Sequence, residues 1–289
     1  MNYAAVHSIA WLMLLFLLFG IVQHLLMLIM YKRIFLRLAK IPYVSALFDR
    51  PTVLLHELVG HLIPAILSGS RIVGMDLHET KGSVSVKYEK NMFGTASVFI
   101  AGFGPTFFIP LVFIATYAML NSYDIIPLIM QMDAFARMEM MLSRISGAVG
   151  PEMIMLVYLA AIMAPGAASS PGDVRSVLSF VRAAPLKVVF WGLVAVLVMY
   201  ISHTMGFRIA DYFTSVIIAT FSAYLVMYSV ALPLLACIVL AYERKGYIYA
   251  IAGFAAAYLS VAYFLPWFGY PLIVGLVFAN VLLIAKGKK

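Results

Sequence analysis

The chain has 289 residues, of which 64% are hydrophobic and 11% charged, and its mean hydropathy is +1.02. Soluble globular domains are about half apolar and about a quarter charged, so this composition excludes an ordinary soluble protein and indicates an integral membrane protein. The formal charge of +8 comes from short basic clusters between apolar runs. Such clusters are typical of loops that face lipid headgroups, and they argue against a nucleic-acid partner.

Apolar runs that could cross the lipid bilayer recur along the chain. A spanning helix needs about 20 mainly apolar residues. Because irregular backbone is tolerated in hydrocarbon only where protein or water covers it, we predict an all-α polytopic membrane protein with about eight hydrophobic helical segments. These would form a single integral membrane domain over residues 1–289. The long runs are 8–31, 95–120, 187–203, 213–241, 247–264 and 268–285, and the two shorter runs are 51–68 and 150–166.

The short run at 51–68 contains ionisable residues, in the stretch His56-Glu57-Leu58-Val59-Gly60-His61. We interpret this stretch as an HExxH motif on an α-helix. In that motif two histidines on one face, about 6 Å apart along the axis, bind one zinc ion, and the glutamate is a general base. The motif therefore predicts His56 and His61 as zinc ligands and Glu57 as the catalytic base. The alternative is that the three side chains only hydrogen-bond to each other inside the bundle, although ionisable groups at membrane depth usually serve function or pairing.

Residues 69–94 break the helical pattern. After "ETKG", serine and lysine alternate with valine and tyrosine, which is the period-two pattern of a β-strand, and we predict a short β-hairpin after the motif helix. The edge of such a hairpin can bind an extended peptide through main-chain hydrogen bonds. Candidate substrate-binding residues are Ser83, Val84, Ser85 and Val86. A simple surface turn is the alternative.

Three further features follow the hairpin. The stretch "AGFGP" interrupts the start of the run at 95–120, where small residues allow another backbone to approach closely. Residues 122–149 mix methionines with aspartate and arginine, which predicts an interfacial amphipathic helix. Residues 164–176, "APGAASSPGDVRS", predict an irregular loop or a broken helix.

A catalytic zinc ion normally has three protein ligands and a water in the fourth position, so the motif needs one more ligand. Asp173 is the candidate because it lies in a Pro- and Gly-rich break beside a short apolar run, where a bent backbone could bring a carboxylate into the bundle. The residues alone support equally well the alternative that Asp173 caps a helix starting at Val174.

The motif "HELVGH" on an apolar helix, a hairpin, "AGFGP" opening another membrane helix and "SPGDVRS" together resemble the site-2 protease family of intramembrane zinc metalloproteases, especially its smaller prokaryotic branch. The resemblance covers about residues 51–180, which would be the metalloprotease core, and leaves 187–289 as additional transmembrane helices. It implies one zinc ion per chain, with His56, His61 and Asp173 as ligands and Glu57 as the base.

Two positions depart from the pattern of that family. Phe108 stands three residues after the "GP" dipeptide, where many members have asparagine. The aspartate of the family usually lies in an "LDG"-like motif, whereas this chain has "PGDV". The resemblance therefore implies no asparagine that helps to bind the substrate here.

The sequence predicts a zinc metalloendopeptidase that hydrolyses peptide bonds of a membrane-spanning protein substrate with a zinc-activated water. The alternative is a non-catalytic membrane transporter or scaffold that binds a metal. Glu57 favours the enzyme, because a structural zinc site has no use for a base. We expect a multi-pass protein of the cell membrane, and most of the basic loops place the hairpin, Asp173 and the C-terminus in the cytoplasm. The sequence does not define an oligomeric state.

Overall fold

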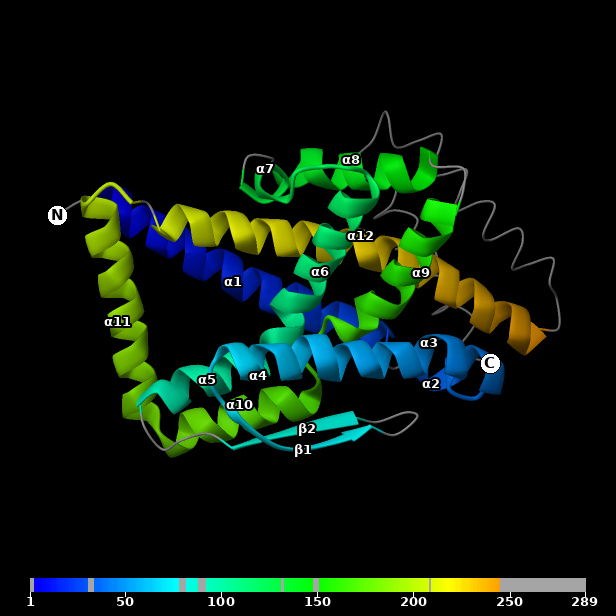
Figure 1. Ribbon diagram of the computed structural model, residues 1–289, viewed down its shortest axis with the longest axis horizontal. Coiled ribbons are helices and arrows are strands. Elements are labelled where there is room, and N and C mark those ends of the chain that lie inside the picture. Colours follow the sequence, from blue (N-terminus) through cyan, green and yellow to red (C-terminus); the bar gives the residue numbers. More distant parts are fainter. Residues whose placement is uncertain are drawn as a thin grey trace.

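The computed structural model describes residues 3–30, 34–77, 82–87, 92–130, 133–147, 151–207 and 209–244, which are mostly helical and include one two-stranded sheet (Figure 1). The prediction of a helical protein with one hairpin is confirmed for these residues. In chain order the elements are α1 (Tyr3–Met30), α2 (Leu36–Leu38), α3 (Pro42–Leu55), the π-helix η2 (His56–Leu62), α4 (Ile63–Leu67), β1 (Arg71–Leu77), β2 (Gly82–Lys87), α5 (Met92–Gly102), α6 (Gly104–Leu120), α7 (Ile125–Met130), α8 (Ala134–Gly147), α9 (Pro151–Gly166), α10 (Pro171–Ala183), α11 (Pro185–Thr204) and α12 (Ile209–Arg244).

Three helices of the described residues, α1, α11 and α12, are long and apolar enough to cross a membrane. They coincide with three of the predicted runs. The predicted run at 95–120 forms two helices, α5 and α6, which meet at an angle of 57° and together would make a fourth span. The runs at 247–264 and 268–285 lie outside the described residues, so the number of eight hydrophobic segments stays a prediction.

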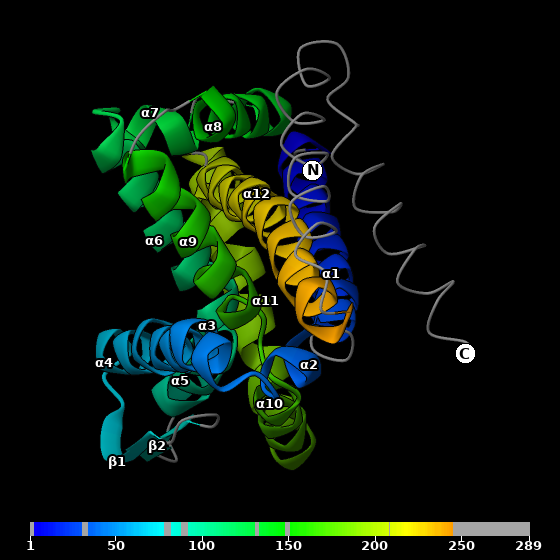
Figure 2. The ribbon, with the colours of Figure 1, turned by 90° about the vertical axis from the view of Figure 1, so that its right-hand side faces the viewer.

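Helix α12 lies at the centre of the bundle. It runs alongside α1 and packs against α9, α6 and α8 (Figures 1 and 2). In its apolar window 67% of the residues are buried, compared with 6% in the window of α11. Burial removes apolar side chains from solvent, so α12 belongs to the protein core, whereas α11 is apolar and little covered by the residues that the structure describes.

The amphipathic segments lie at opposite ends of the molecule. Helices α7 and α8, which occupy the predicted amphipathic stretch 122–149, lie at one end, whereas α10 and the β-hairpin lie at the other (Figure 2). The predicted irregular segment at 164–176 is shorter than expected: α9 continues to Gly166, and α10 already begins at Pro171. The four residues between them connect the core to the end that carries the hairpin.

The hairpin is antiparallel, with Met75 opposite Val84 and an irregularity between Ile72 and Gly74. Strand β1 is exposed along its whole length, while β2 alternates between half-buried and exposed residues. Val84 and Val86 are on its half-buried side. The alternation predicted from the sequence is therefore present, and β2 is the strand that faces the protein.

The glycines of "AGFGP" allow three elements to meet. A Cβ atom on Gly104 would overlap the carbonyl oxygen of Gly60 in η2, and one on Gly102 would overlap Val177 in α10. A Cβ atom on Gly60 would in turn lie 2.7 Å from Cγ of Pro105. The bend between α5 and α6 thus lies directly against η2, and only residues without a side chain permit that approach.

Replacing Gly104 by alanine should destabilise the protein, because the added methyl group must push η2 away from the bend. Overpacking of this kind costs about 1–3 kcal/mol, and thermal unfolding of the purified protein measures it. The matched control is Gly192→Ala in α11, where nothing lies within 4 Å of the added atom. Equal unfolding temperatures for the two variants would contradict the close contact.

Candidate metal centre

The two histidines of the motif are five residues apart, so its description as HExxH on a regular α-helix is wrong. Residues five apart on an α-helix point about 140° away from each other, because each residue turns the helix by about 100°. The segment His56–Leu62 is instead a π-helix, in which hydrogen bonds run from residue i+5 back to residue i. One such bond runs from the Ile63 N–H to the Leu58 carbonyl. The wider turn brings both imidazoles to one side.

The local sequence favours this wider turn. Pro64 has no N–H, so Gly60 O cannot accept the hydrogen bond that it would receive in a regular α-helix. The same carbonyl lies against Gly104 at the bend between α5 and α6. The π-turn therefore lies where the α-helical hydrogen-bond pattern is already incomplete.

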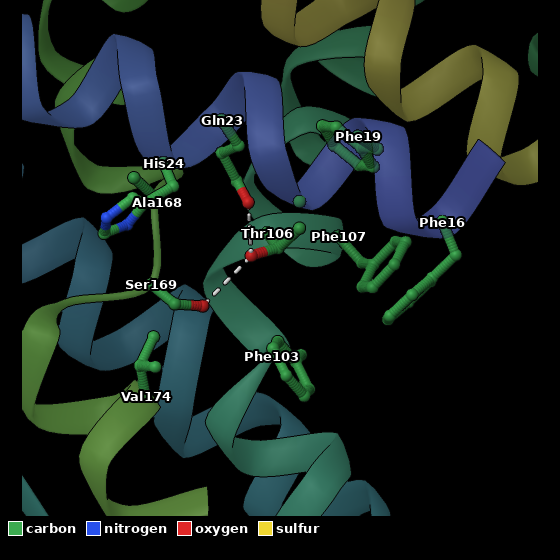
Figure 3. Close-up of a pocket in the computed structure, with 11 residues that line it drawn as sticks. Phe16, Phe19, Gln23, His24, Phe103, Thr106, Phe107, Ala168, Ser169 and Val174 are labelled. Atoms are coloured by element: carbon green, nitrogen blue, oxygen red, sulfur yellow. Dashed lines mark hydrogen bonds between the residues drawn. The ribbon is translucent and has the colours of Figure 1, made fainter. Parts of the chain in front are cut away.

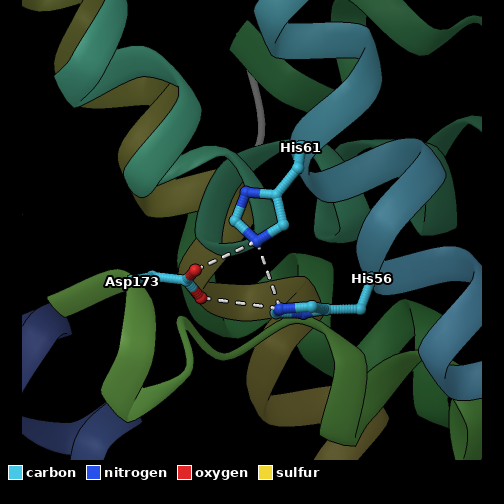
Figure 4. Close-up of side chains that lie close together, drawn as sticks. All are labelled: His56, His61 and Asp173. Carbon is cyan, nitrogen blue, oxygen red and sulfur yellow. Dashed lines mark hydrogen bonds and ion pairs between the residues drawn. The ribbon is translucent and has the colours of Figure 1, made fainter. Parts of the chain in front are cut away.

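Asp173 completes a triangle of side chains with the two histidines (Figure 4). His56 Nε2 lies 3.2 Å from His61 Nε2 and 3.5 Å from Asp173 Oδ2, and His61 Nε2 lies 3.3 Å from Asp173 Oδ1. Zinc binds nitrogen and oxygen at about 2.0–2.1 Å in tetrahedral geometry, which places its ligand atoms about 3.3 Å from one another. The two imidazole nitrogens have about this separation, and one ligand atom from each of the three side chains lies within 4.8 Å of the others, so the group could hold a metal ion.

Backbone carbonyls orient both imidazole rings. His56 Nδ1 lies 2.7 Å from the Gly166 carbonyl oxygen at the end of α9, and His61 Nδ1 lies 2.9 Å from the Ala101 carbonyl oxygen in α5. A carbonyl can only accept, so each Nδ1 carries the proton and each Nε2 keeps its lone pair for a metal. This arrangement is typical of histidines that bind metals.

Asp173 is part of a helix cap as well as the triangle. The cap of α10 is Ser170, and Asp173 is the third helical residue of a capping box. Its N–H donates to Ser170 Oγ over 3.2 Å, and its Oδ2 accepts from the Ser170 N–H over 2.6 Å. The two alternatives for Asp173 are therefore compatible, with the correction that Ser170 rather than Asp173 is the cap and that the helix begins at Pro171.

Glu57 lies beside the triangle without belonging to it. Its side chain is buried beneath β2, where Gly82 touches its Cγ and the Val84 N–H bonds its carboxylate. Burial raises the pKa of the Asp173 carboxyl group, but the two adjacent imidazoles outweigh this effect and hold that pKa below its usual range.

A cleft of about 670 Å³ opens next to these residues, between β2 and α10. Glu57, His61 and Asp173 line it. Among the predicted substrate-binding residues, Ser83, Val84 and Val86 line the cleft, whereas Ser85 is exposed and does not. Helix α10 contributes Ser176, Ser179 and Phe180 to the opposite wall.

Sequence reasoning missed the two carbonyls and the contact of Gly82 with Glu57. A carbonyl acceptor leaves no trace in the identity of its residue, so Gly166 and Ala101 gave no signal. Gly82 appeared in the sequence only as part of a turn. Its importance depends on a neighbour 25 positions earlier in the chain.

Comparisons of the chain with protein-family models, with curated proteins and with solved structures give no match.

The placement of the metal ligands can be tested by moving one histidine. In a His56→Leu background, Glu57→His places two imidazoles at the four-residue spacing of HExxH. We expect this double variant to bind zinc no better than His56→Leu alone, because the Gly166 carbonyl and the Asp173 carboxylate lie beside residue 56, whereas residue 57 is buried beneath β2. Zinc content after dialysis measures the effect. Recovery of wild-type zinc content in the double variant would contradict a metal site built on His56, His61 and Asp173.

Proposed function

We propose that the chain is an intramembrane zinc metalloprotease of the site-2 protease type. The proposal is supported mainly by the combination of three side chains that could hold one metal ion with a glutamate outside that group, at the edge of an open cleft. A zinc ion held by His56, His61 and Asp173 would supply a Lewis acid that lowers the pKa of a bound water and polarises a peptide carbonyl. One ion per chain is expected.

Glu57 is the proposed general base. It follows His56 directly in the chain and lines the cleft together with His61 and Asp173. In this position it can accept a proton from the attacking water and deliver it to the leaving amine. The Val84 N–H bonds the carboxylate, and this contact fixes its orientation beside the triangle.

The composition of the metal site favours an enzyme over a metal-binding transporter or scaffold. Structural zinc sites are normally closed by four protein ligands, whereas catalytic sites keep one position open. Within the part of the chain that the structure describes, the group contains three possible ligands, and the cleft reaches two of them. An open position that faces a cleft is what hydrolysis requires.

The cleft suggests how a substrate binds. A membrane-spanning helix hides its carbonyls in its own hydrogen bonds, so it must be extended before hydrolysis. The Val84 N–H points at Glu57, and alternate residues of a strand direct their backbone groups to the same edge. The backbone groups of Gly82 and Val86 therefore lie along the same edge, on either side of the Val84 N–H that bonds Glu57, and an extended substrate can add to them as a further strand.

The walls of the cleft suggest the chemistry of the substrate. The lining residues that the structure describes are mainly glycine, alanine, valine and serine with one phenylalanine, and none of these described residues is lysine or arginine. We propose that the bound segment carries small, uncharged side chains and belongs to a membrane-spanning protein. The apolar helices support a membrane location, and the basic loops favour a cytoplasmic position for the hairpin end and the C-terminus of a multi-pass protein.

Two variants separate the proposed role of Glu57 as base from that of Asp173 as metal ligand. Glu57→Gln should keep its zinc and lose cleavage of a model membrane-spanning substrate by about 10²–10⁴-fold, the usual contribution of a general base. Asp173→Ala should lose both zinc and cleavage. Zinc content and product formation are measured on the same detergent-solubilised preparations. Wild-type cleavage by Glu57→Gln would contradict the proposed enzyme.

Strand addition is tested at Val86. Val86→Pro removes an N–H from the edge of β2 to which the substrate would add, while Val86→Ala trims the side chain and keeps that N–H. A lost hydrogen bond of about 0.5–1.5 kcal/mol corresponds to roughly a two- to tenfold loss of kcat/KM, which we expect for the proline variant beyond any effect of alanine. Zinc content should not change. Equal turnover by the two variants would refute strand addition.

A further inference from the structure

A buried amide on α1 contacts the segment that joins the two halves of the metal site (Figure 3). Gln23 is 6% exposed. Its Nε2 donates to the Ala167 carbonyl oxygen over 2.7 Å, and its Oε1 accepts from Thr106 Oγ1 over 3.1 Å. Gln23 is thus joined both to the start of α6 and to the residues that follow α9.

The contacted segment is held from a second side by Ser169. Its hydroxyl lies 3.0 Å from Thr106 Oγ1 and 3.1 Å from the Gly102 carbonyl oxygen. Thr106 and Ser169 have one hydroxyl proton each, and these two protons serve three contacts: between Thr106 and Gln23 Oε1, between the two hydroxyls, and between Ser169 and the Gly102 carbonyl oxygen. The bond from Gln23 Nε2 to Ala167 is different, because an amide nitrogen can only donate.

Residues 167–170 connect two parts of the metal site. Gly166, at one end, supplies the carbonyl that orients His56. Ser170, at the other end, caps α10 and bonds both backbone and side chain of Asp173. A displacement of this short segment would change the distance between Asp173 and the imidazoles.

The segment needs a hydrogen-bond donor from outside. In a continuing helix the Ala167 carbonyl would accept from residue 171, but that residue is Pro171, which has no N–H. Gln23 supplies the missing donor. A cavity of about 80 Å³ lies beside the segment, lined in part by Gln23, Ala168, Ser169 and Val174. Packing is therefore incomplete on this side, and hydrogen bonds hold the segment in place.

We propose that Gln23 is a positioning residue of the metal centre. Through Ala167 and Thr106 it fixes residues 167–170, and these set the separation between Asp173 and the two histidines. The inference rests on the proposed zinc site and deepens it, because it makes the affinity of the site for zinc depend on a residue of α1 that contacts neither the ion nor the substrate. Outer hydrogen-bond partners of metal ligands typically contribute about 10–100-fold to metal affinity.

The test is a chelator competition that measures the zinc dissociation constant, with thermal unfolding of the zinc-free protein measured in parallel. Gln23→Met keeps the length of the side chain and removes both hydrogen bonds. It should raise the zinc dissociation constant about tenfold, the lower end of the range for groups that bond a ligand directly, and Thr106→Val should act in the same direction. Because both belong to one network, the double variant should lose less than the product of the two single effects.

His24→Leu is the matched control, since His24 is the next residue of α1 and lines the same cavity. It should keep wild-type zinc affinity. Wild-type affinity in both Gln23→Met and Thr106→Val would overturn the inference, as would a loss fully matched by His24→Leu. Zinc affinity that depends on Gln23 in a protein that cleaves no membrane substrate would uphold the inference and remove the proposed protease activity.

Discussion

Two imidazoles five residues apart can share an ion only where the helix between them is wider than an α-helix. The π-turn at His56–Leu62 provides that width, and the other parts of the site are arranged around it. Pro64 removes one α-helical hydrogen bond, and the bend between α5 and α6 fits against Gly60 because Gly104 has no side chain. The relative positions of the two imidazoles therefore depend on the contact between η2 and α6.

The ligands are held by groups from distant parts of the chain. Carbonyls at the end of α9 and in α5 orient the rings, a capping box fixes Asp173, and Gln23 of α1 is bonded to the segment between them. Such preorganisation matters for a zinc site, because the ion requires its ligand atoms at defined separations. The helices that make the bundle apolar thus also position its few polar side chains.

Much of the fold and of the site could be predicted from the sequence, because apolar runs and ionisable residues within them are strong signals. The three candidate spans followed from long apolar runs and the alternation of β2 from periodicity, and Asp173 was selected for its Pro- and Gly-rich surroundings. The spacing of the histidines was misread as a four-residue one, although the five-residue spacing and Pro64 are both visible in the sequence and favour a wider turn. Ring orientation by Gly166 and Ala101, and the dual role of Asp173, depend on contacts that residue types do not encode.

The central claim is that one metal ion is held by both histidines and Asp173 across the π-turn. X-ray absorption spectroscopy at the zinc edge of the purified, zinc-loaded protein tests it most directly. The account predicts a four-coordinate ion with nitrogen and oxygen ligands at about 2.0–2.1 Å and scattering from two imidazole rings. A spectrum with a single imidazole, or with six oxygen ligands, would contradict it.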